Sequence, residues 1–397
     1  MRGTAVVVGG GLGGITAAVA LRQVGWQVTV LERAAEFGEV GAGVGMMPNA
    51  VRALDALGLG DEVRRVGTPR VPGGVRDPKG RALSYVDVAE LDRLAGRPVA
   101  IHRADLHRVL RAALPPECLV TSADVQEVTP EVRYLDGDRP VVLAPDLVVA
   151  ADGIGSRTRA LLWPAAPAPV YAGTTTWRGV TGPEFADDLE ISQALGPNTE
   201  FGVLPLAGGR VAWYGAVVAP RGERAEDEAA AVRKVFGSWY DPIPRLLAAT
   251  DPETVLRHDI FELGTPLPTY VRGRVALLGD AAHAMTPYLG QGACMAIEDG
   301  VVLAAACAAH DDLDAALARY DRERRPRTQA MAKASRLAGR MGHRLANPVA
   351  VALRDAVLRL TPSRVVVRQM AKFSGWRPPT LPVSPDQVNF ESDPEHR

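Results

Sequence analysis

The chain has 397 residues, which is enough for two domains or for one large domain with an insertion. Hydrophobic residues make up 47% and charged residues 23%, the composition of an ordinary globular protein. Because 45 basic side chains nearly balance 46 acidic ones, no global positive field points to nucleic acid as a partner.

The cysteines and the apolar runs indicate the cellular location of the protein. Cys118, Cys294 and Cys307 lack the spacing of a metal site or a redox pair, so we expect three buried thiols and no metal. The N-terminus "MRGTAVVVGGGLGG" enters a strand at once and lacks the apolar length of a signal peptide. The longest fully apolar run, Val301 to Ala309, is far shorter than the roughly 20 residues of a spanning helix. We therefore expect a cytoplasmic protein without an integral membrane segment.

The first elements along the chain are a strand, a glycine turn, a helix and a second strand, in "AVVVGGGLGGITAAVALRQVGWQVTVLER". Gly9, Gly11 and Gly14 fit G-x-G-x-x-G, a turn in which glycine backbone and free helix N–H groups admit a pyrophosphate. Glu32 ends the second strand, about 20 residues later, where a ribose hydroxyl needs an acceptor. Glutamate at this position favours an unphosphorylated adenosine ribose, as in NAD or FAD.

Two later strand-to-helix junctions also carry acidic residues. In "PDLVVAADGIGSRTR" a buried strand is predicted to end at Asp152, and Ser156 is placed to cap the next turn. In "LGDAAHAMTPYLGQG" Asp280 follows an apolar run, and the glycines open a helix whose N-terminus attracts negative charge. A plain NAD dehydrogenase has no use for either junction.

Together the three segments resemble the single-component FAD-dependent aromatic hydroxylases, the salicylate hydroxylase and para-hydroxybenzoate hydroxylase group of flavoprotein monooxygenases. The resemblance extends over nearly the whole chain and includes "VGAGVGMMPNAVRALDALGLGDEV", "IHRADLHRVL" and "YAGTTTWRGV". It implies an α/β fold: a Rossmann-like FAD-binding domain with a parallel sheet and helices, an inserted β-sheet substrate domain, and C-terminal helices. The expected boundaries are 1–70, 100–165 and 271–335 for FAD binding, 71–99 and 166–270 for the substrate domain, and 336–397 for C-terminal helices and a polar tail.

The resemblance also assigns residues to the cofactor. Asp280 is expected to accept hydrogen bonds from the ribityl chain, and the N–H groups of Gly292 and Ala293 to face the flavin pyrimidine edge. Arg103 is expected near the FAD phosphates and ribityl chain, and the loop from Gly41 to Gly45 near the isoalloxazine ring. The complete expected FAD site is Gly9, Gly11, Leu12, Gly13, Gly14, Glu32, Arg33, Gly45, Arg103, Asp152, Asp280, Gly290, Gly292 and Ala293.

The implied activity is insertion of one oxygen atom from O₂ into an aromatic or related cyclic small molecule. In the resembled enzymes this proceeds through a flavin C4a-hydroperoxide, with NADPH or NADH as a transient electron donor. Many of them have an Asp-Arg pair before the last strand, where this chain has Glu262-Leu263-Gly264. We also expect no His or Arg in the middle sheet to activate a phenol. An epoxidase or heteroatom oxygenase of a larger natural product therefore stays open, as does, more remotely, a non-catalytic redox-sensing flavoprotein.

The substrate pocket is expected between the middle sheet and the flavin ring. Tyr288, next to the flavin helix, is its first candidate residue. Strand alternation places Glu200, Gly202 and Leu204 on one face, either the pocket face or a solvated one. The identity of the substrate, the choice between NADH and NADPH, and the oligomeric state stay open.

Other side chains near this region are expected to have structural roles. Trp177, Trp213 and Tyr214 either wall the pocket or belong to the core, and core is commoner for aromatic residues on a sheet. Arg178 either binds a substrate anion or pairs structurally, and we favour the structural role. His283 is expected to form a structural hydrogen bond and not to act as a base.

The last stretch, "VALRDAVLRLTPSRVVVRQMAKFSGW", is apolar with interleaved arginines, Arg354, Arg359, Arg364 and Arg368. A helix on a membrane surface fits this pattern, and so does a helix that covers its own domain. Because Pro362 interrupts the stretch, we favour the second.

Overall fold

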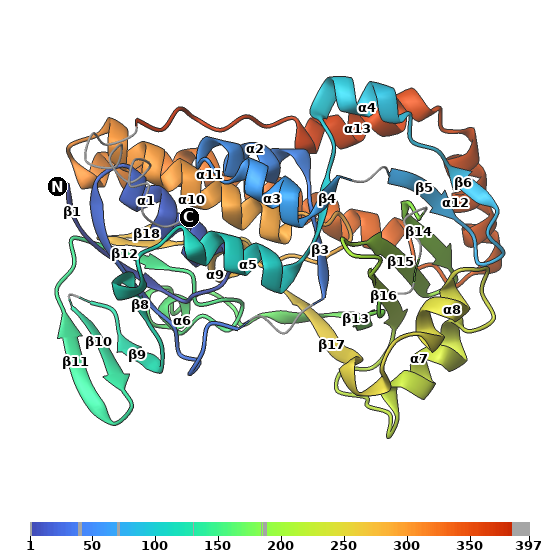
Figure 1. Ribbon diagram of the computed structural model, residues 1–397, viewed down its shortest axis with the longest axis horizontal. Coiled ribbons are helices and arrows are strands. Elements are labelled where there is room, and N and C mark those ends of the chain that lie inside the picture. Colours follow the sequence, from blue (N-terminus) through green and yellow to red (C-terminus); the bar gives the residue numbers. More distant parts are fainter. Residues whose placement is uncertain are drawn as a thin grey trace.

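The computed structural model describes residues 2–38, 42–69, 72–129, 131–183, 185 and 189–382. Two main sheets lie side by side, one with the large helices packed on it and one with a pair of short helices on its outer side (Figure 1). The first sheet is almost wholly parallel, and the second is almost wholly antiparallel. The expected α/β class is therefore confirmed.

The first sheet has six strands in the order β18-β19-β12-β1-β2-β8. Its central strands are short, continuous apolar runs buried on both faces, as parallel strands covered by helices require. They come from three distant parts of the chain. The strands are β1 (Gly3–Val8), β2 (Trp26–Leu31), β8 (Leu119–Val120), β12 (Leu147–Ala150), β18 (Val271–Arg272) and β19 (Val275–Leu277).

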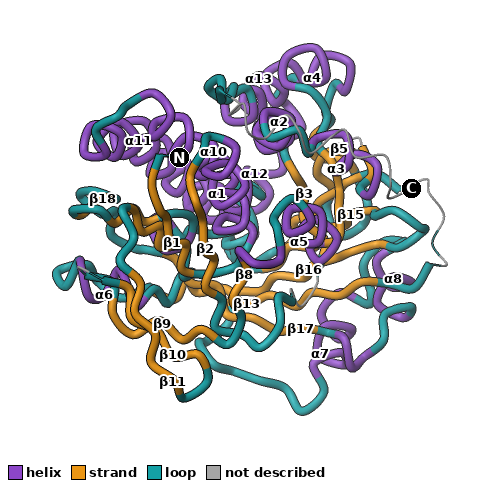
Figure 2. Tube along the Cα trace, turned by 60° about the vertical axis from the view of Figure 1, so that its left-hand side comes forward, coloured by secondary structure: helices purple, strands orange, loops and turns teal. Residues whose placement is uncertain are grey.

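Helices α1, α10 and α11 lie side by side over β1 and β2 (Figure 2). Helices α1 and α10 approach so closely that a Cβ on Gly300 would lie 2.8 Å from the backbone nitrogen of Ala17. By length and composition α10 is apolar enough to span a membrane, but 78% of it is buried inside the protein, as in a core helix. The helices of this part are α1 (Leu12–Gln23), α2 (Pro48–Ala56), α3 (Gly60–Val66), α5 (Arg103–Ala112), α6 (Arg157–Leu162), α9 (Asp280–His283), α10 (Gly292–Ala309) and α11 (Leu313–Met341).

The second sheet has seven strands in the order β17-β13-β16-β15-β14-β5-β6. Its outer face packs against α7 (Glu228–Phe236) and α8 (Ile243–Ala248) in a core that contains Trp177 and Trp213. These two tryptophans therefore belong to the core and do not wall a pocket. The strands are β5 (Pro72–Arg76), β6 (Ala82–Ser84), β13 (Val170–Val180), β14 (Ile191–Gly196), β15 (Thr199–Pro205), β16 (Val211–Val218) and β17 (Leu256–Glu262).

Two small sheets and three further helices complete the fold. The sheet β3-β7-β4, with β3 (Gly43–Met46), β7 (Val99–His102) and β4 (Thr68–Pro69), lies between the two main sheets. A hairpin sheet, β9 (Ala123–Glu127), β10 (Val132–Asp136) and β11 (Arg139–Leu143), extends from the first. The remaining helices are α4 (Val88–Ala95), α12 (Pro348–Leu360) and α13 (Ser363–Ser374).

The expectation that the C-terminal stretch covers its own domain is only half right. Helix α13 packs on α4, and Val367 is buried against Leu91 there. On α12, however, the one buried side chain is Arg354, and four large apolar side chains are exposed: Val349, Leu353, Val357 and Leu360.

Gly43 on β3 is the contact that sets the distance between the two halves of the molecule. A Cβ at this position would lie 2.4 Å from the Cβ of Ala212 and 3.0 Å from Leu204, both on the second sheet. No side chain larger than hydrogen fits without moving β3 away from that sheet.

We expect Gly43→Ala to lower the free energy of unfolding by about 1–3 kcal/mol, the usual cost of overpacking. Gly45→Ala is the matched control, since a Cβ there meets only the end of Met47 at 3.6 Å. Urea unfolding of both apoproteins measures the difference. Equal stability of the two variants would show that the sheets are not in close contact at Gly43.

Candidate functional site

The three acidic or glycine-rich junctions predicted from the sequence meet at one edge of the first sheet. In the register of the parallel strands, Val8 of β1 pairs with Ala150 of β12, which pairs with Leu277 of β19. Each strand ends there, so the turns after β1, β12 and β19 lie next to one another. The carboxyl edge of such a sheet is where α/β folds bind ligands.

The turn after β1 has the geometry of a dinucleotide cradle. Gly9 has φ +103°, and a Cβ on Gly14 would lie 2.0 Å from the carbonyl oxygen of Gly9, so both positions require glycine. No side chain caps α1, and a Cβ on Gly11 would meet nothing within 4 Å. The first N–H groups of α1 therefore point into open space that a phosphate can fill. Leu12 is buried, and Gly13 lies against Leu278 and Ala296.

Glu32 is held at the end of β2 by backbone groups of the turn. Its Oε2 accepts a hydrogen bond from the Gly10 N–H at 2.8 Å, and its Oε1 accepts one from the Ala34 N–H at 2.8 Å. Each carboxylate oxygen keeps a further lone pair for a ribose hydroxyl. Arg33, beside it, is exposed.

The turns after β12 and β19 bring charges to the same edge. Asp152 Oδ2 accepts a hydrogen bond from the Thr158 N–H at 3.0 Å, while its buried Oδ1 has no partner among the described residues. Ser156 caps α6, as predicted, by accepting from the Arg159 N–H at 2.9 Å. Asp280, the first residue of α9, is exposed. Burial lowers the pKa of Arg103, and the nearby negative charge of Asp280 opposes this effect.

The N-terminus of α10 and strand β3 form the adjoining wall. No side chain caps α10, and a Cβ on Gly292 would meet nothing within 4 Å, so the N–H groups of Gly292 and Ala293 are open. Gly290 has φ +62° and makes the turn before the helix. Gly45 lies on strand β3, which pairs with β7, and Arg103 directly follows β7 as the first residue of α5. Gly41, the first residue of the predicted flavin loop, lies outside the described residues.

A buried ion-pair network, which the sequence analysis missed, fixes α10 behind this wall. The Arg324 guanidinium lies 2.6 Å from Asp299 and 2.6 Å from Glu298, and all three side chains are buried. Glu298 also accepts hydrogen bonds from Asn49 on α2 and from Arg327. The available signal was a pair of adjacent acids inside the otherwise apolar helix sequence 292–309.

The second acid of this pair also holds the junction after β19. Asp299 Oδ2 accepts from the Gly279 N–H at 3.0 Å and lies 2.6 Å from His283 Nε2. His283 is buried, and this contact matches its predicted structural role. Burial alone would raise the pKa of Asp299, but His283 and Arg324 lower it to about 2. The network therefore couples α9, α10 and α11.

The inner face of the second sheet, which we call the cleft face, carries a buried polar network. Pairing across the strands places Glu200, Gln193 and Tyr214 there, opposite the tryptophan core. Glu200 Oε1 accepts hydrogen bonds from the Tyr214 hydroxyl at 2.5 Å and from Gln193 at 3.1 Å. Burial, and then the charge of Glu200, raises the pKa of Tyr214 well above its usual value, so the phenol stays protonated.

Tyr288 closes one end of the cleft face. Its hydroxyl donates a hydrogen bond to Thr174 Oγ1 at 3.0 Å, and its ring lies 4.7 Å from the ring of His343. His343 is fully buried, and its Nδ1 lies 3.2 Å from Glu200 Oε2. His343 comes from the segment after α11 and was not predicted, because nothing local marks it as a partner of the sheet.

The expectation of no His or Arg in the middle sheet is wrong, and for Arg178 the described residues show no structural ion pair of the kind that we favoured. Arg178 stands opposite Tyr214 on the cleft face, and His258 stands opposite Thr176 on the same face. Within the described ranges no carboxylate lies within ion-pair distance of Arg178. Burial lowers the pKa of its guanidinium, and Arg103 is close enough to be affected by its charge. Within the described residues, the cleft face thus carries a positive charge that has no ion-pair partner.

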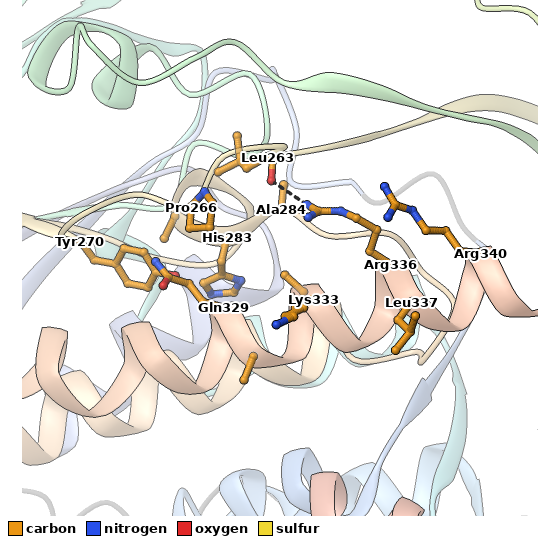
Figure 3. A pocket seen from close by; sticks show the side chains of 13 residues that line it. Leu263, Pro266, Tyr270, His283, Ala284, Gln329, Lys333, Arg336, Leu337 and Arg340 are labelled. Carbon is orange, nitrogen blue, oxygen red and sulfur yellow. Dashed lines mark hydrogen bonds between the residues drawn. The ribbon is translucent and has the colours of Figure 1, made fainter.

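A cavity of about 520 Å³ lies elsewhere, between α11 and the segment after β17 (Figure 3). Its wall includes His283, Lys333 and Arg336, and Arg336 donates a hydrogen bond to the carbonyl oxygen of Leu263. The cavity contacts neither the glycine turn nor Arg178. It reaches the end of α9 through Ala282 and His283, but neither Asp280 nor the glycine turn lines it.

Comparison with known proteins agrees with this geometry. The family model described as "FAD binding domain" matches residues 2–335. The aurachin C monooxygenase/isomerase of Stigmatella aurantiaca is 36% identical over 91% of this chain and 94% of its own length. The 3-amino-4-hydroxybenzoate 2-monooxygenase of Streptomyces cremeus is 36% identical over 83% of this chain and 85% of its own. A Klebsiella pneumoniae protein crystallised with FAD and uric acid superposes with TM-score 0.85 at 29% identity, over 94% and 96% of the two chains.

The acidic residues of the site can be tested by FAD titration. We expect Asp280→Ala and Glu32→Ala each to weaken FAD binding by about 10- to 100-fold, the loss of one or two charge-assisted hydrogen bonds. Asp61→Ala, an exposed acid on α3, is the control. Flavin fluorescence quenching measures the dissociation constants, and wild-type affinity in both site variants would contradict the assignment.

The buried network can be tested by denaturation. We expect Arg324→Met to lower the free energy of unfolding by about 3–5 kcal/mol at pH 7, because it removes a fully buried cation that the Glu298 and Asp299 carboxylates share. Arg319→Met, which breaks a partly exposed pair with Glu323 on the same helix, is expected to cost about 0–1 kcal/mol.

The pH dependence has a definite sign. Since the folded pKa of Asp299 lies below the unfolded value of about 3.9, its stabilisation is complete above that pH and is lost as the pH falls toward 2. The difference between wild type and Arg324→Met should therefore shrink over this acid range. Equal losses in the two arginine variants at pH 7 would argue against a special role for the network.

Proposed function

The chain belongs to the FAD-binding domain family and is an FAD-dependent monooxygenase, and on this premise we propose which side chains bind its cofactor and substrate. Bound FAD, reduced by NADPH or NADH, supplies the activated oxygen. In our proposal the turn from Gly9 to Gly14 and the start of α1 hold the pyrophosphate, and Glu32 binds the adenosine ribose. Asp280 and Arg103 hold the ribityl side, and the N-terminus of α10 faces the pyrimidine edge.

Several observations support this assignment. The space beside Gly11 and Gly292 is open, and neither α1 nor α10 has a side-chain cap. The carboxylate of Asp280 is exposed at this edge, and Asp152 has a buried oxygen without a partner in the described chain. Uncapped helix N-termini favour negative charge, which both the pyrophosphate and a reduced flavin carry.

For the substrate we propose a small aromatic or related cyclic compound with an acidic oxygen, held against the cleft face by Arg178. The observation that carries this proposal is the partly buried, unpaired guanidinium on that face, within electrostatic reach of Arg103. Two of the similar proteins are linked to compounds of this class: one is named for a hydroxybenzoate, and one was crystallised with uric acid. A cation beside a phenol or an acidic heterocycle favours its anion, and the anion gives up electron density more readily to an electrophilic oxygen.

The other cleft-face groups have supporting roles in this proposal. The Glu200 carboxylate is already bonded by Tyr214 and Gln193, so we assign it to positioning those side chains and not to proton abstraction. Burial, and then Arg178, lowers the pKa of His258, which is therefore neutral near pH 7 and offers a hydrogen bond without charge. Tyr288 remains our candidate for the wall at the far end.

A larger substrate is the second possibility, and one finding favours it. The aurachin C monooxygenase/isomerase, whose name couples oxygenation to isomerisation, matches over 91% of this chain. Oxygenation or epoxidation of a larger polycyclic natural product therefore stays in the substrate test. Because Cys118, Cys294 and Cys307 are free and buried, we also propose a reducing, cytoplasmic location.

The proposal predicts a specific kinetic defect. We expect Arg178→Gln to raise KM for an acidic substrate by about 10- to 100-fold, the loss of a charge-assisted hydrogen bond, with FAD affinity unchanged. Arg178→Lys should recover part of this loss because it keeps the charge but not the planar fork. Arg245→Gln, an exposed arginine on α8, is the control.

The measurement is NADH and NADPH oxidation by the FAD-loaded protein, with peroxide and product mass recorded. The panel contains phenolic acids, acidic nitrogen heterocycles, indoles and polycyclic alkenes. An acidic compound that accelerates oxidation without peroxide, and whose KM depends on Arg178, supports the proposal. A neutral polycyclic substrate whose kinetics are unaffected by Arg178→Gln would overturn it in favour of the second possibility.

A further inference from the structure

Helix α12 is built with its apolar side facing away from the protein. Val349, Leu353, Val357 and Leu360 recur every three or four residues, and so form one stripe along the helix. Their exposed fractions are 76%, 64%, 55% and 81%. The monooxygenase site does not use this stripe, because it lies at the edge of the molecule beside β6 and β14 (Figure 1).

The inward side of α12 carries the half-buried Val351 and Leu358 and a buried polar anchor, Arg354, that fixes the orientation of the helix. Arg354 is buried and donates hydrogen bonds to the carbonyl oxygens of Gly342 at 2.9 Å and Leu195 at 3.2 Å. Asp355 pairs with the same guanidinium at 2.7 Å. Rotating the helix to bury the stripe would break these bonds without providing new partners for the Arg354 guanidinium. The apolar stripe is therefore a permanent part of the surface.

The C-terminal segment that carries the stripe is strongly basic. Residues 331–382 contain ten lysines and arginines against a single acid, Asp355, in a chain whose net charge is −1. Elsewhere exposed arginines pair with acids one helical turn away, as in Arg65 with Glu62 and Arg93 with Glu90. Seven exposed basic residues of this segment have no carboxylate within ion-pair distance in the described chain, namely Lys333, Arg340, Arg344, Arg364, Arg368, Lys372 and Arg377.

From the stripe and its charge we propose that α12 docks the enzyme on an anionic lipid bilayer. An amphipathic helix with aliphatic side chains on one face and arginines beside it lies in the headgroup plane, where the aliphatic groups insert and the cations meet lipid phosphates. A second copy of the chain fits less well, since a two-fold interface would bring the same basic segments together. The bilayer would supply negative charge to the exposed cations that have no carboxylate within ion-pair distance in the described chain.

The docked edge is also the edge of the substrate sheet. Arg354 bonds to the end of β14, and the Asn198 N–H donates to the carbonyl oxygen of Leu345 at 3.1 Å in the turn that follows. A substrate dissolved in the membrane would therefore meet the enzyme on the side that carries the cleft-face strands. Docking itself does not depend on the proposed substrate, and the test below needs no turnover.

The test is cosedimentation of the FAD-loaded full chain with vesicles. One set is pure phosphatidylcholine, and the other contains about one-third phosphatidylglycerol to give a negative surface. We expect the enzyme to bind the anionic vesicles at low salt, with at least about tenfold lower affinity for the neutral ones and for anionic vesicles at high salt. A protein that stays in solution with both sets overturns the proposal.

Variants separate the stripe from general charge attraction. We expect Leu353→Glu with Leu360→Glu to reduce binding to anionic vesicles by at least about tenfold, since two inserted side chains become charged. Leu161→Glu is the matched control, because Leu161 on α6 is 56% exposed and lies far from α12. Arg364→Gln with Arg368→Gln should reduce the dependence on phosphatidylglycerol. Unchanged binding in the stripe variant overturns the proposal.

Sedimentation velocity without lipid tests the competing occupant. We expect wild type and the stripe variant to have the same oligomeric state. A wild-type dimer that the stripe variant dissociates, together with the absence of vesicle binding, would make the stripe an interface between two copies and overturn lipid docking. Thermal unfolding of both proteins confirms that the exposed substitutions leave the fold intact.

Discussion

The site depends first on the buried ion pairs of Arg324 with Glu298 and Asp299. Helix α10 is apolar on all sides, and apolar packing alone does not determine how such a helix is rotated or how far it slides. The adjacent acids point in directions about 100° apart, so their partners on α2, α9 and α11 define both the rotation of α10 and its position along its axis. The N-terminus of α10 is thereby held at the edge where the three strands end.

A second constraint is that both faces of the seven-stranded sheet are covered. Helices α7 and α8 cover one face, so tryptophan and phenylalanine side chains fill it. The other face meets β3 at Gly43, where close packing leaves room only for hydrogen, and elsewhere it carries Glu200, Tyr214 and Arg178. A polar group is buried at low cost only with a partner. Glu200 has its partners within the protein, whereas Arg178 lacks a carboxylate in the described chain and so is suited to an anion from outside.

The contrast between local signals and contacts from distant parts of the chain explains what the sequence could and could not predict. The three turns were predictable because their signals are local: glycines at Gly9 and Gly279 adopt positive φ, and apolar strands precede them. Alternation along β15 correctly grouped Glu200 with Gly202 and Leu204, but it could not say which face was inside. That depends on which elements cover the sheet, and these come from other parts of the chain. For the same reason the sequence could not decide between a structural partner and a substrate anion for Arg178, and the structural partner that we favoured is not found among the described residues.

The C-terminal segment shows how such distant elements complete a site. Arg354 ties α12 to the end of β14 and to the carbonyl oxygen of Gly342, one residue before His343. His343 in turn lies against Glu200 and beneath the Tyr288 ring. A displacement of α12 would thus be transmitted through two short, buried links to the polar network of the cleft face. The outer surface of α12 is apolar, and its inner surface is bonded to elements that carry the cleft face. The helix therefore connects whatever binds its outer surface to the substrate side of the enzyme, which a helix that only covered the core would not do.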